Sequence, residues 1–94
     1  MKHKNLPRIK MVSLVGIVNY FKDDTSLPET DAEIDQIISK APIWWKNYNL
    51  IFPRHKVKND KITVAYWDND CWKKIYLNPF GNIDPNSIVP TRMK

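Results

Sequence analysis

Apolar residues recur at helical spacing in the segment that begins at Thr30. Spacings of three, four and seven residues give one apolar stripe, formed by Ile34, Ile37, Ile38 and Ala41. Thr30 and Glu33 have the spacing of a capping box, in which the threonine hydroxyl accepts from the Glu33 amide and the glutamate reaches back to the Thr30 amide. Pro42 cannot continue a helix. The pattern therefore predicts a capped helix over about 31–40.

Two runs rich in β-branched and aromatic residues, 61–67 and 72–77, flank the polar stretch 68–71. This order predicts a β-hairpin whose turn is built from Asp and Asn residues. If Trp67 faces Trp72, the first face of the hairpin is an ordinary core face, made of Ile62, Val64, Tyr66, Ile75 and Leu77. The second face sets aromatic rings beside a lysine and comprises Thr63, Ala65, Trp67, Trp72, Lys74 and Tyr76.

The remaining segments give weaker signals. In 9–21 the composition favours a strand and the spacing of polar residues favours a helix; we expect a buried strand. A further strand is expected around 48–52, where Pro53 suits an edge strand or a bulge. Residues 1–8 are expected to form a loose basic arm. The chain from 79 onward is expected to lie over the surface as a tail with a disordered end, about 85–94.

These elements predict the fold class. Segregated helix and strands indicate an α+β fold, with the capped helix packed on a mostly antiparallel sheet of three to four strands. The chain has 94 residues, and domains usually hold about 100 to 200, so residues 1–94 are expected to form a single domain.

The charge is unevenly distributed. Residues 22–39 hold six acids and one lysine, a net charge of −5, whereas the rest of the chain carries +10 and the whole chain +5. Acids would repel a nucleic acid from one side of such a bipolar molecule. The net positive charge is therefore weak evidence for nucleic-acid binding.

Few residues are suited to catalysis or metal binding. The single cysteine, Cys71, excludes an intramolecular disulfide and favours a reducing, cytoplasmic location. Pairing of Cys71 with His55 as nucleophile and base is conceivable, but a turn thiol is the simpler interpretation. One cysteine and two distant histidines do not make a zinc site, and two glycines cannot build a phosphate-binding loop. We expect no enzymatic activity, no cofactor and no metal.

The aspartate pairs Asp68/Asp70 and Asp23/Asp24 are explained by turn and loop geometry rather than by acid–base catalysis. The apolar stretch 11–21 is shorter than the roughly 20 apolar residues that span a bilayer, so no membrane partner is expected.

Aromatic and basic residues are the candidates for a binding surface. Trp67, Trp72 and Tyr76 form an exposed platform or pack under the tail against Phe80 and Ile83; both arrangements fit the sequence. Trp44 and Trp45 would point to opposite sides of an extended chain, which leaves one of them near the surface. The predicted binding residues are Trp67, Trp72, Lys74, Tyr76, Trp44, Trp45, Arg54, Lys56 and Lys58.

Two functions fit this surface. The favoured hypothesis is a protein-binding adaptor or inhibitor of the kind that phages and mobile elements carry, because tryptophan and tyrosine dominate protein interfaces. Its alternative is a nucleic-acid-binding module, in which lysines and arginines contact phosphates and the hairpin aromatics stack on bases.

Overall fold

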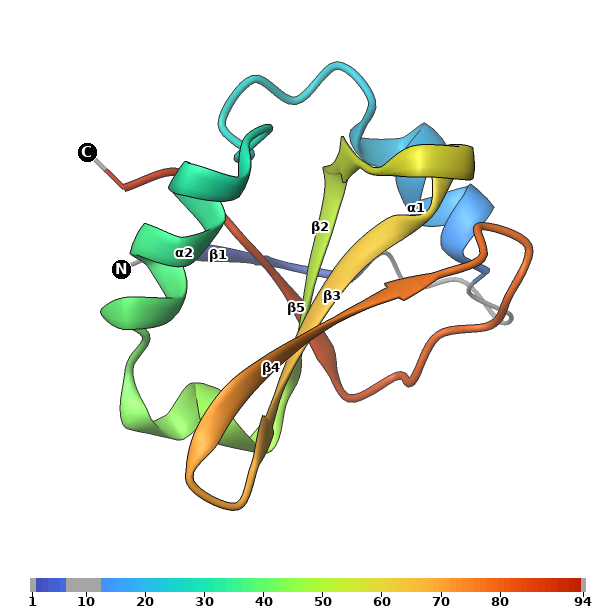
Figure 1. Cartoon of the computed structure of the whole chain (residues 1–94). Coiled ribbons are helices and arrows are strands. Elements are labelled where there is room, and N and C mark those ends of the chain that lie inside the picture. Colours follow the sequence, from blue (N-terminus) through green and yellow to red (C-terminus); the bar gives the residue numbers. More distant parts are fainter. Residues whose placement is uncertain (1, 7–12, 94) are drawn as a thin grey trace.

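A five-stranded sheet runs through the computed structural model, which describes residues 2–6 and 13–93. The strand order is β1-β5-β2-β3-β4 (Figure 1). The strands are β1 (His3–Asn5), β2 (Asn49–Lys56), β3 (Ile62–Asp68), β4 (Cys71–Leu77) and β5 (Ser87–Pro90). Neighbouring strands are antiparallel except β2 and β5, which are parallel. The predicted α+β class is confirmed, although the described residues form more strands than the sequence suggested.

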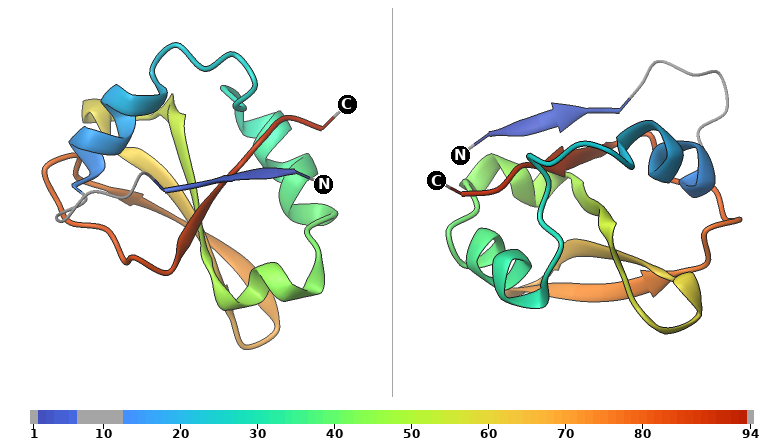
Figure 2. Two further views of the ribbon diagram at one scale, coloured as in Figure 1. Left: turned by 180° about the vertical axis from the view of Figure 1, so that it is seen from behind. Right: turned by 90° about the horizontal axis from the view of Figure 1, so that it is seen from above.

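The two α-helices cover opposite faces of this sheet (Figure 2). Helix α1 (Leu14–Phe21) belongs to one core cluster and helix α2 (Asp31–Ser39) to the other. Successive residues of β2 alternate between the clusters: Leu50 and Phe52 lie in the α2 cluster, and Ile51 lies in the α1 cluster. Because side chains alternate across a strand, the central strands are buried on both faces.

The prediction of a strand over 9–21 was wrong for residues 14–21. Residues 14–21 form helix α1, while 9–12 lie outside the described residues. The Ser13 side chain caps the helix, accepting from the Gly16 amide at 3.1 Å, and Leu14, Ile17 and Phe21 are buried on one face. Burial of one face at helical spacing outweighed the strand preference of the β-branched residues.

Helix α2 confirms the predicted capped helix, with one difference in its cap. The Glu33 amide donates to the Thr30 hydroxyl at 3.2 Å, as expected. The Glu33 carboxylate instead accepts from the Glu29 amide at 3.3 Å and from the Thr30 hydroxyl at 3.1 Å. The reciprocal bond therefore goes to the amide one residue before the one predicted.

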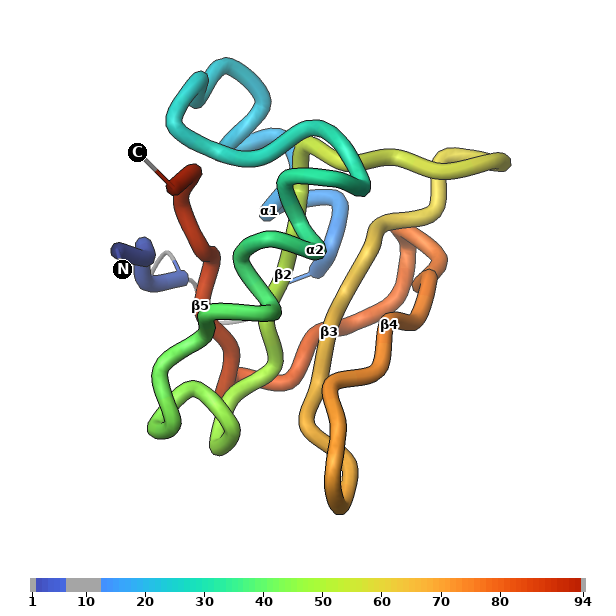
Figure 3. Tube along the Cα trace, turned by 60° about the vertical axis from the view of Figure 1, so that its left-hand side comes forward, coloured from blue at the N-terminus to red at the C-terminus, as the bar shows by residue number. Residues whose placement is uncertain are grey.

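The hairpin is formed with the predicted register. Trp67 pairs with Trp72 and Asp68 with Cys71, which leaves Asn69 and Asp70 in the turn. Asn69 has φ of 57°, a left-handed conformation that asparagine tolerates better than most residues. Figure 3 shows this turn projecting beyond the other strands.

Pro53 lies within β2 and does not end it. The pairing of β2 with β3 shifts register between Phe52 and Lys56, so the proline lies at an irregularity, as the bulge interpretation predicted. Strand β2 is nonetheless central, because β5 pairs along its other side.

Both ends of the chain were predicted wrongly. The expected tail contains β5, whose four residues are all buried between β1 and β2. The expected loose arm contains β1, which pairs with β5 from His3↔Pro90 to Asn5↔Ile88; residues 7 and 8 lie outside the described residues. Each strand has only three or four residues, too few to give a local strand signal, and each is stabilised by pairing with strands distant in sequence.

We predict that Thr30→Ala lowers the free energy of unfolding by about 1 kcal/mol, because it removes the side-chain acceptor for the Glu33 amide. In a domain of this size the thermal midpoint should fall by about 4 to 8 °C. Ser39→Ala, which removes an exposed hydroxyl from the other end of α2, is the matched control and should change the midpoint little. Equal melting of all three proteins would contradict the capping role.

Candidate functional site

The 3-10 helix η1 (Ile43–Asn47) lies beside strand β3 of the hairpin, and Tyr48, which follows η1, lines a small pocket together with Trp67. The rings of Trp67 and Trp72 lie 5.7 Å apart between centroids and nearly perpendicular, at 77°. The Lys46 ammonium lies 3.9 Å from the centre of the Trp67 ring, which joins η1 to the hairpin by a cation–π contact. We call this surface the aromatic end, formed by Trp44, Lys46, Tyr48, Trp67 and Trp72.

The aromatic end is partly packed and partly open. Trp44 is 47% exposed and Ile43 beside it is 80% exposed. Trp67 and Trp72 are half-buried, and Trp72 packs against the core cluster of α2. Trp67 and Trp72 therefore form neither a fully exposed platform nor a fully buried pair of rings, the two arrangements that the sequence allowed.

Phe80 and Ile83 do not cover these tryptophans. Phe80 is 83% exposed, and Ile83 packs against the α1 cluster on the other face of the sheet. Trp67 contacts Lys46 and Trp72, and it lines a small pocket together with Asp84 and Asn86 of the C-terminal segment. The C-terminal segment therefore approaches Trp67 through polar residues, and not through the Phe80 and Ile83 side chains that the sequence suggested.

Trp44 and Trp45 have separate roles. Trp45 is fully buried in the α2 cluster, while Trp44 lies at the surface, 5.8 Å from Tyr48 between ring centroids. The expectation that one of the two lies near the surface is confirmed, although they belong to a 3-10 helix rather than an extended chain. The Trp45 indole nitrogen has no hydrogen-bond partner among the described residues.

Lys74 and Tyr76 lie on the same face of β4 as Trp72, further from the turn. The Lys74 ammonium donates to Asp35 at 2.8 Å and lies 3.9 Å from Asp31. The hydrogen bond that Lys74 donates to Asp35 raises the pKa of Lys74. Lys74 therefore anchors α2 to the sheet, and Tyr76 remains 46% exposed beside it.

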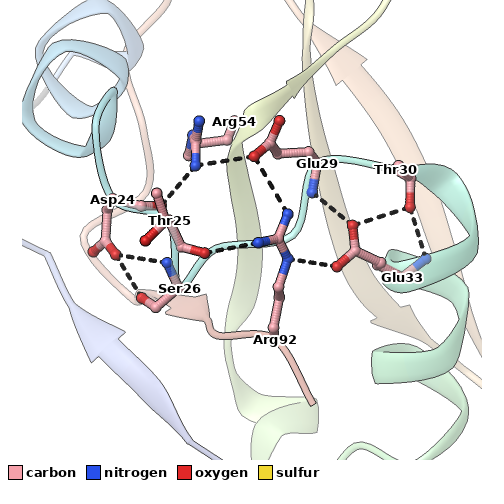
Figure 4. A network of polar contacts seen from close by, with 8 residues as sticks. All are labelled: Asp24, Thr25, Ser26, Glu29, Thr30, Glu33, Arg54 and Arg92. Carbon is pink, nitrogen blue, oxygen red and sulfur yellow. Dashed lines mark hydrogen bonds and ion pairs between the residues drawn. The ribbon is translucent and has the colours of Figure 1, made fainter. Parts of the chain in front are cut away.

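Arg54 belongs to a polar network that lies apart from the aromatic end (Figure 4). Its guanidinium donates to the Asp24 carbonyl at 3.0 Å and pairs with Glu29 at 3.0 Å. The same Glu29 carboxylate pairs with Arg92 at 3.3 Å, and Arg92 donates to Glu33 at 2.5 Å. These contacts tie the loop before α2 to β2 and to the segment after β5.

Lys56 and Lys58 are exposed at the opposite end of the sheet from the hairpin turn. Lys56 pairs with Ile62 at the start of β3, and Lys58 lies in the 3-10 helix η2 (Lys58–Asp60). Trp67 lies near the other end of β3. Of the predicted basic residues, Lys74 therefore lies beside the hairpin aromatics, whereas Lys56 and Lys58 do not.

Arg92 was missed by the sequence analysis, because the segment around it was expected to be a disordered tail. Its backbone amide donates to the Ser26 carbonyl at 2.7 Å, and its side chain also donates to the Thr25 carbonyl at 2.8 Å. The net charge of −5 over 22–39 was the sequence feature that could have indicated a cation from elsewhere in the chain beside this segment, because carboxylates in a folded protein are commonly paired with cations.

His55 and Cys71 are not brought together. His55 is buried and bonds through Nδ1 to the Thr63 hydroxyl at 2.7 Å, with Nε2 at 3.4 Å from Asp31. Thr63 is itself fully buried, so a substrate cannot reach its hydroxyl. Cys71 is exposed at the hairpin turn, the other end of the β3–β4 pair.

Within residues 2–6 and 13–93, no group of three His, Cys, Asp or Glu side chains is arranged to hold a metal ion. No helix in these ranges is both long and apolar enough to cross a membrane.

The carboxylates of the network are held ionised by their partners. Hydrogen bonds from Lys4 and from Ser26 lower the pKa of Asp24 to about 2. Burial opposes ionisation of Glu33, but hydrogen bonds from Arg92, the Glu29 amide and Thr30 outweigh it, so the pKa of Glu33 also lies below its ordinary value. Both carboxylates therefore stabilise the fold in their charged form.

We predict that the stabilising effect of Asp24 depends on pH. Since its pKa is about 2 in the folded protein and 3.8 ordinarily, its contribution is complete above about pH 5 and is lost as the pH falls toward 2. Thermal melts of the protein and of Asp24→Asn at pH 7, 4 and 2.5 should give a difference in midpoint that shrinks across the series. A difference that does not change with pH would contradict the ion pair.

No model of a known protein family matches this sequence, and no curated protein or solved structure is significantly similar to it.

Proposed function

We propose that this chain is a small, non-enzymatic protein-binding adaptor or inhibitor that docks through its aromatic end. The observation that carries the proposal is that Lys46 and Tyr48 connect the aromatic residues of η1 to Trp67 of the hairpin, with Trp44 47% exposed and Ile43 80% exposed. Exposed apolar and aromatic surface is typical of interaction sites. Tryptophan and tyrosine are also the residues on which binding energy concentrates at interfaces.

The half-burial of Trp67 and Trp72 supports the same proposal. Rings that are already held by neighbours lose little conformational freedom when a partner covers their open side. Lys46 holds Trp67 from η1, and the α2 cluster holds Trp72. The aromatic end is thus a preorganised surface rather than a set of mobile side chains.

The acidic segment 22–39 is less available to a partner than its sequence suggested. Four cations, Lys4, Arg54, Lys74 and Arg92, form ion pairs with its carboxylates. These pairs neutralise much of the acidic cluster within the chain. They also remove four cations from the set that could contact phosphates, which favours a protein partner over a nucleic acid.

The setting that we propose for this function is the cytoplasm, in the kind of inhibitor or adaptor that phages and mobile elements carry. Support for a reducing compartment comes from the single, exposed thiol of Cys71.

We predict that Trp44→Ala weakens binding of the partner by about 2 kcal/mol, roughly thirtyfold, because an exposed tryptophan at the centre of an interface is a typical hot spot. The partner is first captured from a host extract treated with nuclease, then purified, and its dissociation constant is measured for each variant. Trp67→Ala should weaken binding similarly.

The controls separate binding from folding. Phe80→Ala, a more exposed aromatic beyond the far end of β4, should leave the dissociation constant unchanged. Trp45→Ala should lower the free energy of unfolding by about 3 to 5 kcal/mol, since Trp45 is fully buried, whereas Trp44→Ala should lower it far less. Unchanged affinity in both Trp44→Ala and Trp67→Ala would refute docking at the aromatic end.

Nucleic-acid binding is the second candidate, favoured by the cation of Lys46 lying directly over the Trp67 ring. Under the protein-binding proposal, we predict no detectable binding to single-stranded oligothymidylate at about 50 mM salt. If nucleic acid is the ligand, binding should be detectable there and should fall steeply by about 200 mM, because bound phosphates release counterions. Fluorescence anisotropy of a labelled oligonucleotide decides between them.

A further inference from the structure

A groove of about 880 Å³ lies where the two ends of the chain meet, apart from the hairpin tryptophans. Four of its lining residues are cations, Lys2, Lys4, Lys40 and Arg92, and its apolar part comes from Pro42 and Met93. The described residues that line it include no acid and no aromatic side chain. The groove is therefore a basic and aliphatic surface.

Strand β1 and the residue before it form one side of this groove. The Lys2 carbonyl accepts from the Thr91 amide at 3.1 Å and from the Thr91 hydroxyl at 3.0 Å, which fixes the N-terminal strand beside residues 91–93. Figure 2 shows the N- and C-terminal segments running close together, with the end of α2 on the same side of the molecule. Lys40 and Pro42 enter the groove from the end of α2.

Strand β1 is also an edge of the sheet, since β5 is its neighbour in the strand order. Both backbone polar groups of a strand residue point to the same side, and successive residues alternate. Because the Lys2 carbonyl points inward to Thr91, the backbone groups of His3 and Asn5 point outward. Among the described residues no strand pairs with that side, so it offers hydrogen bonds to an added strand.

The cations of the groove are of two kinds. Lys4 and Arg92 are paired with Asp24, Glu29 and Glu33. Lys2 and Lys40 are exposed, and neither has a carboxylate at ion-pair distance within the described residues. Lys2 and Lys40 thus line a groove in which Arg92 is held by the network of Figure 4 and Lys4 is paired with Asp24.

We propose that this groove binds an extended acidic segment of a partner protein. The segment adds to the outer edge of β1, sets its carboxylates on Lys2 and Lys40, and rests its apolar side chains on Pro42 and Met93. This inference rests on the proposed protein-binding function and specifies the chemistry of the partner. A nucleic acid fits the groove less well, because no aromatic ring lines it for base stacking.

The probe for this proposal is a fluorescent peptide of about six residues with alternating glutamate and leucine, since side chains of an extended strand alternate between two sides. Its binding to the full chain is measured by anisotropy at about 50 mM salt. We expect saturable binding of this peptide, and no binding of the same peptide with lysine in place of glutamate. Methylation of alternate peptide nitrogens should weaken binding about tenfold or more, because it removes donors to β1.

The double variant Lys2→Glu/Lys40→Glu should weaken peptide binding at least about tenfold, and Lys2→Arg/Lys40→Arg should retain it. Lys58→Glu/Lys61→Glu is the matched control: it changes the net charge equally, at two exposed lysines that adjoin β3. Melting curves establish that each variant is folded. An equal loss in both charge-reversed variants would mean general electrostatic attraction and would overturn the proposal.

Two further outcomes separate this proposal from the proposed function. Trp67→Ala should leave peptide binding unchanged, because Trp67 does not line the groove. If the peptide does not bind while partner capture still depends on Trp67, the groove proposal fails and the aromatic end stands. Binding of oligothymidylate through Lys2 and Lys40, with no binding of the peptide, would also overturn the groove proposal.

Discussion

Strand β5, near the C-terminus, lies inside the sheet and pairs with the N-terminal strand, and the other features depend on that placement. Its neighbours are β1 from the N-terminus and β2 from the centre of the chain. Ile88 packs into the core of α2 and Val89 into the core of α1, so this short strand contributes to both sides of the fold. Without β5, β1 has no partner, Arg92 does not reach the carboxylates before α2, and the groove between the termini does not form.

The ion-pair network follows from this arrangement and changes how the charge of the chain is interpreted. In sequence the chain is bipolar, with acids concentrated in 22–39. In the folded protein Arg54 and Arg92 share Glu29, and Lys74 pairs with Asp35 across the face of the sheet. Arg54 and Arg92 share one carboxylate, so these pairs form a network, and such networks are the case in which surface ion pairs add to stability. The network therefore holds the loop before α2 in place, and a binding partner would contact other surfaces of the protein.

Two surfaces remain for a partner, and β1 lies between them. His3 stacks edge-on against Trp44 at 5.2 Å between ring centroids, while its neighbour Lys4 points to the other face and lines the groove. The aromatic end supplies apolar area, and the groove supplies charge and an open strand edge. A partner that covered both would combine the desolvated aromatic contacts that dominate affinity with charge complementarity, which sets orientation and specificity.

The sequence by itself determined the local elements whose signals lie within a few residues. The cap at Thr30, the stripe of α2 and the pairing of Trp67 with Trp72 each depend on neighbours along the chain, and all three were predicted correctly. Only the tertiary structure decided the strands at the two ends, the helix α1 and the roles of Arg54, Lys74 and Trp45. Strand β5 has only four residues and gains its stability from partners distant in sequence, so no local pattern reveals it. The groove likewise brings together residues from the two ends of the chain, and the aromatic end joins η1 to the hairpin, because long-range pairing, rather than propensity, places them side by side.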